Sequence, residues 1–296
     1  MRLRDTIRAA LAPKARLPSV FNLAWYELLV IFLILAGNGF LFEGYGGLNY
    51  GVQVLSIIVV AVIVVKLHGQ RVQLVEALAL ISVFYLVYAV AFVLNHVPTI
   101  SSLATVSLTY FPLNLVPTSF VTLVTLNGTM LILIIAIIAR RKLSRRDLGL
   151  TGGLRLAYLI PFGALVAVPL ALMEYSILMR GALIPNPSAS ELIGLSIVMI
   201  FFVALVEELL FRVLLQPQFI ERSGAIAGIL ITSVLFGAYH ASYGNVYEVL
   251  FATGAGVVFG VAFYKTNNLP FVVTIHAVED ILLWGVLPFL PLALPH

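Results

Sequence analysis

The 296-residue sequence lacks cysteine entirely and has few charged residues. Without cysteine the chain forms no disulfide, carries no thiol nucleophile and binds no zinc through cysteine. Charged residues make up 10% of the sequence and hydrophobic residues 61%, whereas soluble domains have about 25% and roughly 45–50%. A soluble domain of this length has too little interior to bury so much apolar surface. The composition therefore indicates an integral membrane protein.

Several familiar catalytic signatures are absent too. The sequence contains no HExxH, no GxSxG and no glycine-rich phosphate loop. It has three aspartates, of which Asp280 alone falls in an apolar run, so an aspartyl dyad inside the membrane is excluded. The net charge of +4 comes with basic residues that cluster between apolar runs without interleaved aromatic residues. These residues are typical of membrane topology signals and not of a nucleic-acid surface.

Nine apolar runs approach the length of about 20 residues that spans a bilayer. They cover residues 23–43, 50–67, 74–95, 119–139, 156–178, 191–216, 224–242, 246–264 and 269–290. Because Pro288 and Pro291 interrupt the last run, we predict eight or nine spans. The predicted fold is all-α, a polytopic transmembrane helical bundle.

The basic residues predict the orientation of this bundle. They lie at the N-terminus and in every second loop after it, and Arg180 alone lies in a loop on the other side. Since cytoplasmic loops carry an excess of Lys and Arg, the N-terminus is predicted to be cytoplasmic. Residues 1–20 contain five basic residues and are predicted to form an amphipathic helix on the membrane surface.

Charged residues within apolar runs need an explanation, because a charge at the bilayer centre costs at least about 2.5–3.5 kcal/mol. Some glutamates lie at or near the ends of runs, where a carboxylate reaches water, namely Glu27, Glu43, Glu76, Glu174 and Glu191. Other polar or aromatic positions stand out in the last third of the chain, namely Glu207, Glu208, Arg212, Phe236, His240, His276 and Asp280. These candidate site residues lie on three of the apolar runs, 191–216, 224–242 and 269–290.

Helical spacing predicts the direction of these side chains. Glu208 and Arg212 are four residues apart on one face and can form an ion pair, while Glu207 is turned about 100° away. His276 and Asp280 also share a face, so the carboxylate of Asp280 can accept a hydrogen bond from the ring. We therefore expect Glu207 to be directed away from the ion pair.

Distances along the helices bring the polar groups to similar depths. Glu208 and His240 lie about 15 and 16 residues from the turn at Gly224, or roughly 22–25 Å along their helices, so they can face each other. His276 follows the turn near Asn267 by about 9 residues, or roughly 14 Å. We therefore expect one intramembrane cavity lined by polar groups. A set of structural ion pairs and an ion-coupled transport site are the other interpretations of such a cluster.

The residue types leave two hydrolytic mechanisms open. Two histidines and a glutamate form the three-ligand set of a catalytic zinc, whose fourth position holds water. The same groups can act without metal if the glutamate removes a proton from water, one histidine orients that water and the other stabilises the oxyanion. Both mechanisms hydrolyse an amide bond within or at the membrane.

Three short motifs resemble those of a known family. The segments EELLFR, FGAYH and HAVED resemble the EExxxR, FxxxH and HxxxN/D motifs of the CPBP family, in the same order. That family comprises CAAX prenyl proteases of the Ras-converting type, together with bacteriocin-processing and self-immunity membrane proteins. The resemblance covers about residues 191–284 and nothing before them.

The resemblance implies roles for the first two motifs. Glu207 matches the general base, Glu208 its neighbour and Arg212 the ion-pair partner. His240 matches the histidine that holds the attacking water together with the glutamate. Phe236, on the same helical face, would support His240 by shielding its imidazole.

The third motif differs at its last position from that of the eukaryotic-type members. His276 and Asp280 match the pair that stabilises the oxyanion or completes a metal site, for which the candidate ligands are Glu207, His240, His276 and Asp280, and zinc the candidate ion. Eukaryotic-type prenyl proteases have Asn where this chain has Asp280, and an ionised Asp cannot donate to an oxyanion. This difference counts in favour of a metal site at His276 and Asp280.

The resemblance implies an intramembrane endopeptidase that cuts near the terminus of a membrane-associated or lipidated peptide or protein. Residues 1–180 would be an N-terminal transmembrane region with a cytoplasmic basic arm, and residues 181–296 the CPBP-like protease core of one continuous membrane domain. The expected partners are membrane lipids and the substrate, and the expected location is the plasma membrane of a prokaryote. A non-proteolytic scaffold or bacteriocin-immunity protein and an ion-coupled transporter remain alternatives.

Overall fold

A computed structural model describes residues 23–42, 46–66, 73–96, 118–150, 156–178, 181–184, 186–243 and 245–290 of the chain. Within these ranges all the regular structure is helical, as the sequence predicts. The predicted N-terminal amphipathic helix, Glu43, Arg180 and Pro291 lie outside the described residues. The predicted cytoplasmic N-terminus therefore stays a prediction.

The described helices correspond one for one to the predicted apolar runs. In the first part of the chain they are α2 (Trp25–Phe42), α3 (Gly46–Lys66), α4 (Gln73–His96), α6 (Thr118–Arg141) and α7 (Leu156–Leu178). A continuous helical segment follows, made of α8 (Ala189–Val198), the π-helix η3 (Met199–Ala204), α9 (Leu205–Glu208), the π-helix η4 (Leu209–Leu215) and α10 (Gln216–Ser223). The last helices are α11 (Ala225–Tyr239), the 3₁₀ turn η5 (His240–Tyr243), α12 (Val246–Thr266), α13 (Leu269–Gly285) and the 3₁₀ turn η6 (Leu287–Phe289).

Six helices in the described part of the chain are long and apolar enough to cross a membrane. Shorter apolar stretches occur in α2, α4 and α11, over Trp25–Gly39, Gln73–Val87 and Ala225–Tyr239. These lengths support an integral, multi-pass membrane protein. The predicted number of eight or nine spans stays a prediction.

The segment from α8 to α10 is longer than its apolar run, which was predicted to end at residue 216. It begins with a capping box, in which the Ser188 side chain accepts from the Glu191 backbone and Glu191 accepts from the Ser188 backbone. It continues past Pro217 because the π-helix changes the hydrogen-bond pattern there, with the Gln216 N–H bonded to Phe211 O. The missing N–H of proline is tolerated in the first turn of α10.

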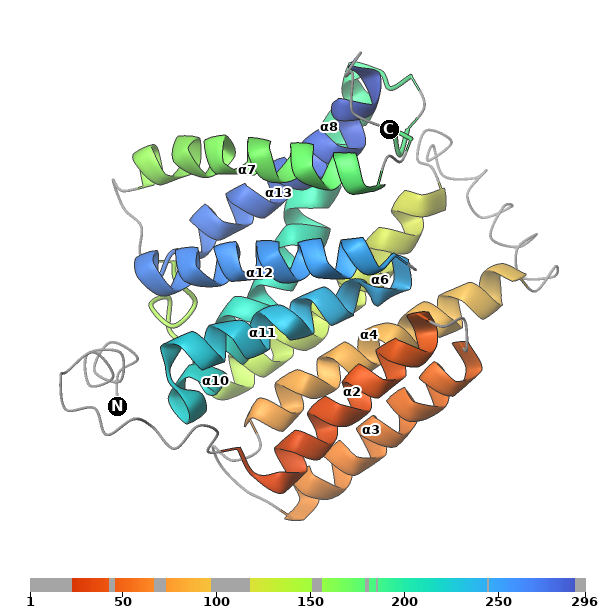
Figure 1. The fold of residues 1–296 in the computed structure, drawn as a ribbon, viewed down its shortest axis with the longest axis vertical. Helices are drawn as coiled ribbons and strands as arrows, with labels where there is room; N and C mark the ends of the chain where they lie inside the picture. Colours follow the sequence, from red (N-terminus) through yellow and green to blue (C-terminus); the bar gives the residue numbers. More distant parts are fainter. Residues whose placement is uncertain are drawn as a thin grey trace.

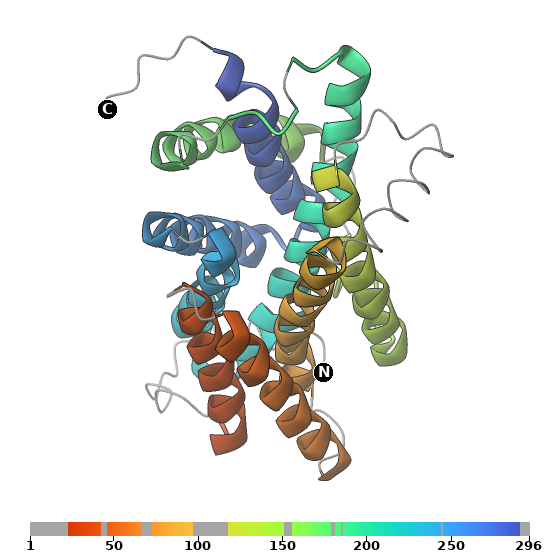
Figure 2. The ribbon, with the colours of Figure 1, turned by 90° about the vertical axis from the view of Figure 1, so that its right-hand side faces the viewer.

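This long segment forms the centre of the molecule. It runs past α13, α12 and α11, while α2, α3 and α4 gather at the opposite end from α7 (Figures 1 and 2). Helix α13 packs on α7 and on η3, and α11 packs on both α12 and α10. Residues 206–216 are all buried, so the EELLFR segment lies inside the bundle.

Two of the glutamates expected near water, Glu27 and Glu174, are buried. Glu27 is 2% exposed and accepts from Arg222 of α10 at 3.0 Å. Glu174 is 7% exposed, although it was also expected to reach water. That expectation was wrong because tertiary packing covers these ends of α2 and α7, a contact that the position in a helix does not show.

Candidate active site

Glu208 is the anchor of the polar cluster. Its Oε2 accepts from Arg212 Nε at 2.9 Å, and both side chains are 0% exposed, so the predicted ion pair is present. Its other oxygen, Oε1, lies 3.0 Å from Nδ1 of His276 on α13. Sequence spacing had related His276 only to Asp280. The carboxylate of Glu208 thus joins the long central segment to α13.

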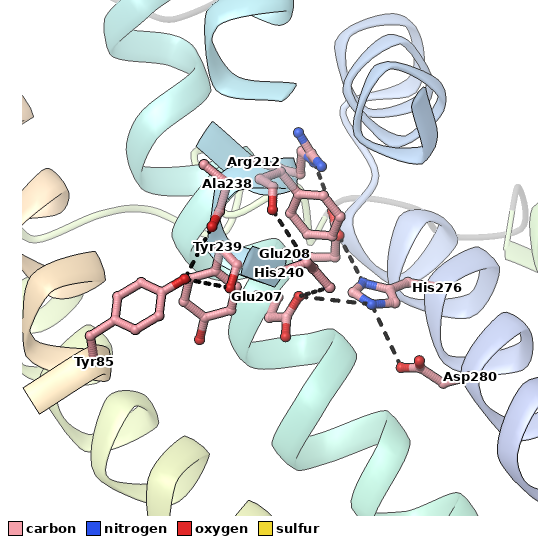
Figure 3. A network of polar contacts seen from close by, with 10 residues as sticks. Tyr85, Glu207, Glu208, Arg212, Ala238, Tyr239, His240, His276 and Asp280 are labelled. Atoms are coloured by element: carbon pink, nitrogen blue, oxygen red, sulfur yellow. Dashed lines mark hydrogen bonds and ion pairs between the residues drawn. The ribbon is translucent and has the colours of Figure 1, made fainter. Parts of the chain in front are cut away.

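Glu207 is directed away from this pair, toward two imidazole rings. Its Oε2 lies 4.0 Å from His240 Nε2 and 3.9 Å from His276 Nε2, as the dashed lines in Figure 3 show. Oε2 is buried and makes no hydrogen bond with described residues. The residues on α9, η5 and α13 therefore meet around one carboxylate oxygen, in the arrangement expected from the sequence.

The hydrogen bond made by Nδ1 of each ring shows that this nitrogen carries a proton. His240 Nδ1 lies 2.9 Å from Phe236 O, and a carbonyl can only accept, so this nitrogen carries the proton. The neutral His240 ring then presents a lone pair at Nε2. His276 Nδ1 likewise faces the ionised Glu208, which is an acceptor, and donates to it. Both Nε2 atoms are left to face Glu207.

Aromatic rings enclose these groups. The Phe236 ring lies 4.8 Å from the His240 ring and 5.8 Å from the His276 ring. Phe259 stacks on His276 at 5.1 Å. The Arg212 guanidinium carbon lies 5.2 Å from the centre of Phe236 and 5.9 Å from that of Phe259, within cation–π range. The rings restrict the orientation of both imidazoles and of Arg212, which agrees with the shielding role expected of Phe236.

Asp280 extends the cluster along α13. Its Oδ2 lies 3.6 Å from His276 Nε2, beyond a normal hydrogen bond, and this buried atom has no hydrogen-bond partner in the described structure. His276 therefore lies among three carboxylates, those of Glu207, Glu208 and Asp280. Such surroundings stabilise an imidazolium, whose Nε2–H can donate to a developing oxyanion.

The grouping of ligand atoms differs from the predicted metal set. Among the described residues, three side chains that could bind a metal each have one ligand atom within 4.8 Å of those of the other two. They are His276, Glu279 and Asp280. Glu207 and His240 are not in this group. Sequence reasoning missed Glu279, although a carboxylate in an apolar run, three residues after a histidine and on the same face, was a usable signal.

Two further glutamates adjoin Glu279. Glu174 of α7 forms side-chain hydrogen bonds with Glu279 and with Glu248 of α12. Glu248 and Glu279 are 1% and 4% exposed. Carboxyl groups in such contact must share a proton or a cation, because two ionised carboxylates repel each other and neither can donate. Sequence reasoning gave Glu248 no role and placed Glu174 near water.

Helices outside the motif region hold the end of α11. The Tyr85 hydroxyl of α4 donates to Tyr239 O at 2.7 Å and to Ala238 O at 3.1 Å (Figure 3). Asn38 of α2 also donates to Ala238 O, at 3.0 Å. Carbonyls at a helix C-terminus lack partners within the helix. These contacts fix the backbone immediately before His240, a role for the N-terminal helices that the sequence did not suggest.

Comparison with known proteins agrees with the resemblance of the motifs. Residues 189–282 match the family model of the Rce1-like type II CAAX prenyl endopeptidases. No match was found among curated proteins or among solved structures. The matched segment includes every residue of the polar cluster from Glu207 to Asp280. Residues 189–282 are thus an Rce1-like segment, as the three motifs predict, and this match implies a peptide hydrolase, an intramembrane protease.

Proposed function

We propose that the protein is an intramembrane endopeptidase that cuts a peptide bond near the terminus of a membrane-associated or lipidated peptide or protein. The observation that supports this proposal most is the position of Glu207. Its buried Oε2 has no hydrogen-bond partner and lies 4.0 and 3.9 Å from the Nε2 atoms of His240 and His276. A carboxylate facing two imidazoles in an enclosed site can activate water.

The spacing suits one water molecule. A water hydrogen-bonded at about 2.8 Å to two acceptors accommodates an acceptor separation of about 4 Å. Glu207 Oε2 and the lone pair on His240 Nε2 are two such acceptors, at 4.0 Å. A water between them donates one hydrogen to each. Its oxygen lone pairs are then free to attack a carbonyl carbon.

In the proposed reaction, Glu207 removes a proton from this water while the water oxygen forms a bond to the scissile carbonyl carbon. The carbonyl electrons move to oxygen, and the Nε2–H of His276, as imidazolium, donates to that oxyanion. The proton held by Glu207 then passes to the amide nitrogen. The C–N bond breaks, releasing a carboxylic acid and an amine.

Glu208 and Arg212 act through His276. Glu208 orients His276 through the Nδ1 contact of 3.0 Å, and Arg212 holds Glu208 at 2.9 Å. Asp280, being an acceptor when ionised, cannot donate to the oxyanion. Its carboxylate near His276 instead favours the charged form of the ring that can donate.

The predicted zinc set does not fit this geometry. Tetrahedral zinc with ligands at about 2.0–2.1 Å needs ligand atoms about 3.3 Å apart. The separations from Glu207 Oε2 to the two histidines are 4.0 and 3.9 Å. His240 is also absent from the group of described ligand atoms that come together. We therefore propose the glutamate mechanism, with no step that requires a metal at Glu207.

A peptide-cleavage assay tests this function. Purified protein in detergent is incubated with a synthetic peptide that carries a C-terminal lipid, and the products are identified by mass spectrometry. Glu207→Gln and His240→Ala should each lower kcat by about 10²–10⁴-fold, the range of general acid–base catalysis. Glu221→Gln, at an exposed position on α10, is the matched control and should cleave like wild type. Cleavage by Glu207→Gln at the wild-type rate would refute the proposed base.

A further inference from the structure

A second group of carboxylates lies beside the proposed catalytic glutamate, on three different helices. Glu174 belongs to α7, Glu248 to α12, and Glu279 and Asp280 to α13. The first three are 7%, 1% and 4% exposed. The catalytic mechanism proposed above gives no role to Glu174, Glu248 or Glu279.

Among the described residues, the basic side chain that forms an ion pair with Glu174, Glu279 or Asp280 is His276, whose Nε2 lies 3.6 Å from Asp280 Oδ2. In the described part of the chain, no lysine or arginine forms an ion pair with Glu174, Glu279 or Asp280. Arg212, the arginine of the cluster, is already paired with Glu208. A buried carboxylate without a partner is costly in an apolar bundle, so such groups pair with one another or bind cations.

Two carboxylate oxygens of α13, Glu279 Oε1 and Asp280 Oδ2, lack a hydrogen-bond partner among the described residues. Glu279 is 4% exposed, and its buried Oε1 makes no hydrogen bond with described residues. One ligand atom each from Glu279, Asp280 and His276 lies within 4.8 Å of the others. A cation bound to oxygen at about 2.0–2.6 Å has ligand atoms roughly 3–5 Å apart. The three residues therefore have the spacing of a cation site.

The surroundings of His276 also resemble those of a metal ligand. A metal-bound histidine usually donates its other ring N–H to a carboxylate, which fixes the ring. His276 Nδ1 faces Glu208 Oε1 at 3.0 Å, and the opposite nitrogen, Nε2, lies 3.6 Å from Asp280 Oδ2. Nε2 is thus directed toward the carboxylates of α13.

We propose that His276, Glu279 and Asp280 bind one divalent cation, with Glu174 and Glu248 completing its surroundings. The set is rich in oxygen and contains one imidazole, which favours Mn²⁺ or a similar hard cation over ions that prefer nitrogen and sulfur. The cation offsets the charge of the buried carboxylates and links α7, α12 and α13. It lies beside the catalytic pair of Glu207 and His240. Because Nδ1 of His276 donates to Glu208, the cation takes the lone pair of Nε2 in place of a proton, so the cation-bound and the oxyanion-donating forms of His276 exclude each other.

Manganese binding tests this site without any peptide substrate. The full-length protein in detergent is treated with EDTA, transferred to chelator-free buffer and titrated with MnCl₂, and free Mn²⁺ is measured by its EPR signal. We expect about one bound Mn²⁺ per chain with a Kd below about 1 mM. Glu279→Gln should weaken binding by roughly 100-fold or more, and Glu174→Gln by about 10-fold, because they remove a ligand and a neighbouring carboxylate. Glu221→Gln should bind like wild type.

The outcomes separate this site from the proposed reaction. Glu207→Gln should lose peptide cleavage but still bind Mn²⁺, and its melting temperature should rise with MnCl₂ as that of wild type does. If wild type binds none of Mn²⁺, Mg²⁺, Ca²⁺ or Zn²⁺ with a Kd below about 1 mM, the cation site is wrong even if cleavage occurs. Binding unchanged in both Glu279→Gln and Glu174→Gln would also overturn it. Cation binding without peptide cleavage would leave the site standing and reject the proposed reaction.

Discussion

The Glu208–Arg212 ion pair allows a sharp test of how the cluster is held together. Both side chains are 0% exposed and joined by one hydrogen bond of 2.9 Å. That bond is made by Nε of Arg212, and Nη1 and Nη2 have no hydrogen-bond partner among the described residues. Arg212 therefore depends on Glu208 for compensation of its charge, while Glu208 has two partners, Arg212 and His276. The informative variants are Arg212→Met, Glu208→Gln and the double variant, compared in a double-mutant cycle.

The expected energies follow from this burial. Removing one partner of a buried pair costs about 3–5 kcal/mol, because the remaining charge stays buried. Arg212→Met and Glu208→Gln should each lower the free energy of unfolding by this amount. The double variant removes both charges at once. Its loss should fall short of the sum of the single losses by about 1–3 kcal/mol.

Reversible unfolding in mixed micelles with increasing SDS, followed by far-UV circular dichroism, measures these energies. The pair between Arg140 and Glu76 is a matched control, because the Arg140 side chain is 59% exposed. Its coupling energy should stay below about 1 kcal/mol. If the single losses at Glu208 and Arg212 add within about 0.5 kcal/mol, the two residues do not compensate each other, and the reasoning is wrong.

Two further predictions concern the helices around the site. Tyr85→Phe removes the hydroxyl that holds the last carbonyls of α11, so kcat should fall by about 5- to 100-fold through misplacement of His240 while KM stays similar; Tyr158→Phe, at a side chain 79% exposed, should leave steady-state kinetics unchanged. Gly228→Ala should lower the free energy of unfolding by about 1–3 kcal/mol, because the new Cβ would lie 2.5 Å from the backbone of α10. Gly254→Ala, with no atom within 4 Å of its Cβ, should stabilise α12 by about 0.5–1 kcal/mol; equal thermal unfolding of the two alanine variants would contradict close packing at Gly228.

The helical class and the main polar cluster could be predicted because they depend on local patterns. Apolar runs of spanning length give the helices, and the i,i+4 spacing of Glu208 and Arg212 gives their ion pair. Equal distances from the turn at Gly224 correctly brought His240 near the EELLFR segment. The apolar run was predicted to end at residue 216, whereas the helical segment continues to Ser223, because the polar residues of α10 pack against other helices although they are not part of an apolar run.

Local sequence patterns did not predict the cluster of Glu174, Glu248, Glu279 and Asp280. Glu174 was placed near water because it lies toward the end of an apolar run, but α13 packs on α7 and buries it. Glu248 lies in the first turn of α12 and was not considered. No spacing within one helix relates these residues to Glu279. Their proximity depends on how three helices are placed and rotated against one another.

The sequence by itself therefore determined that this is an all-helical membrane protein with an Rce1-like set of acidic, basic and imidazole side chains. Composition and helical periodicity are sufficient for that, because each depends on neighbours within a few turns of one chain segment. Only the tertiary structure decided that Glu208 pairs with His276, that Tyr85 and Asn38 hold the end of α11, and that Glu279 lies against Glu174. Those contacts join residues from different helices, and the packing of side chains across the bundle sets which faces meet.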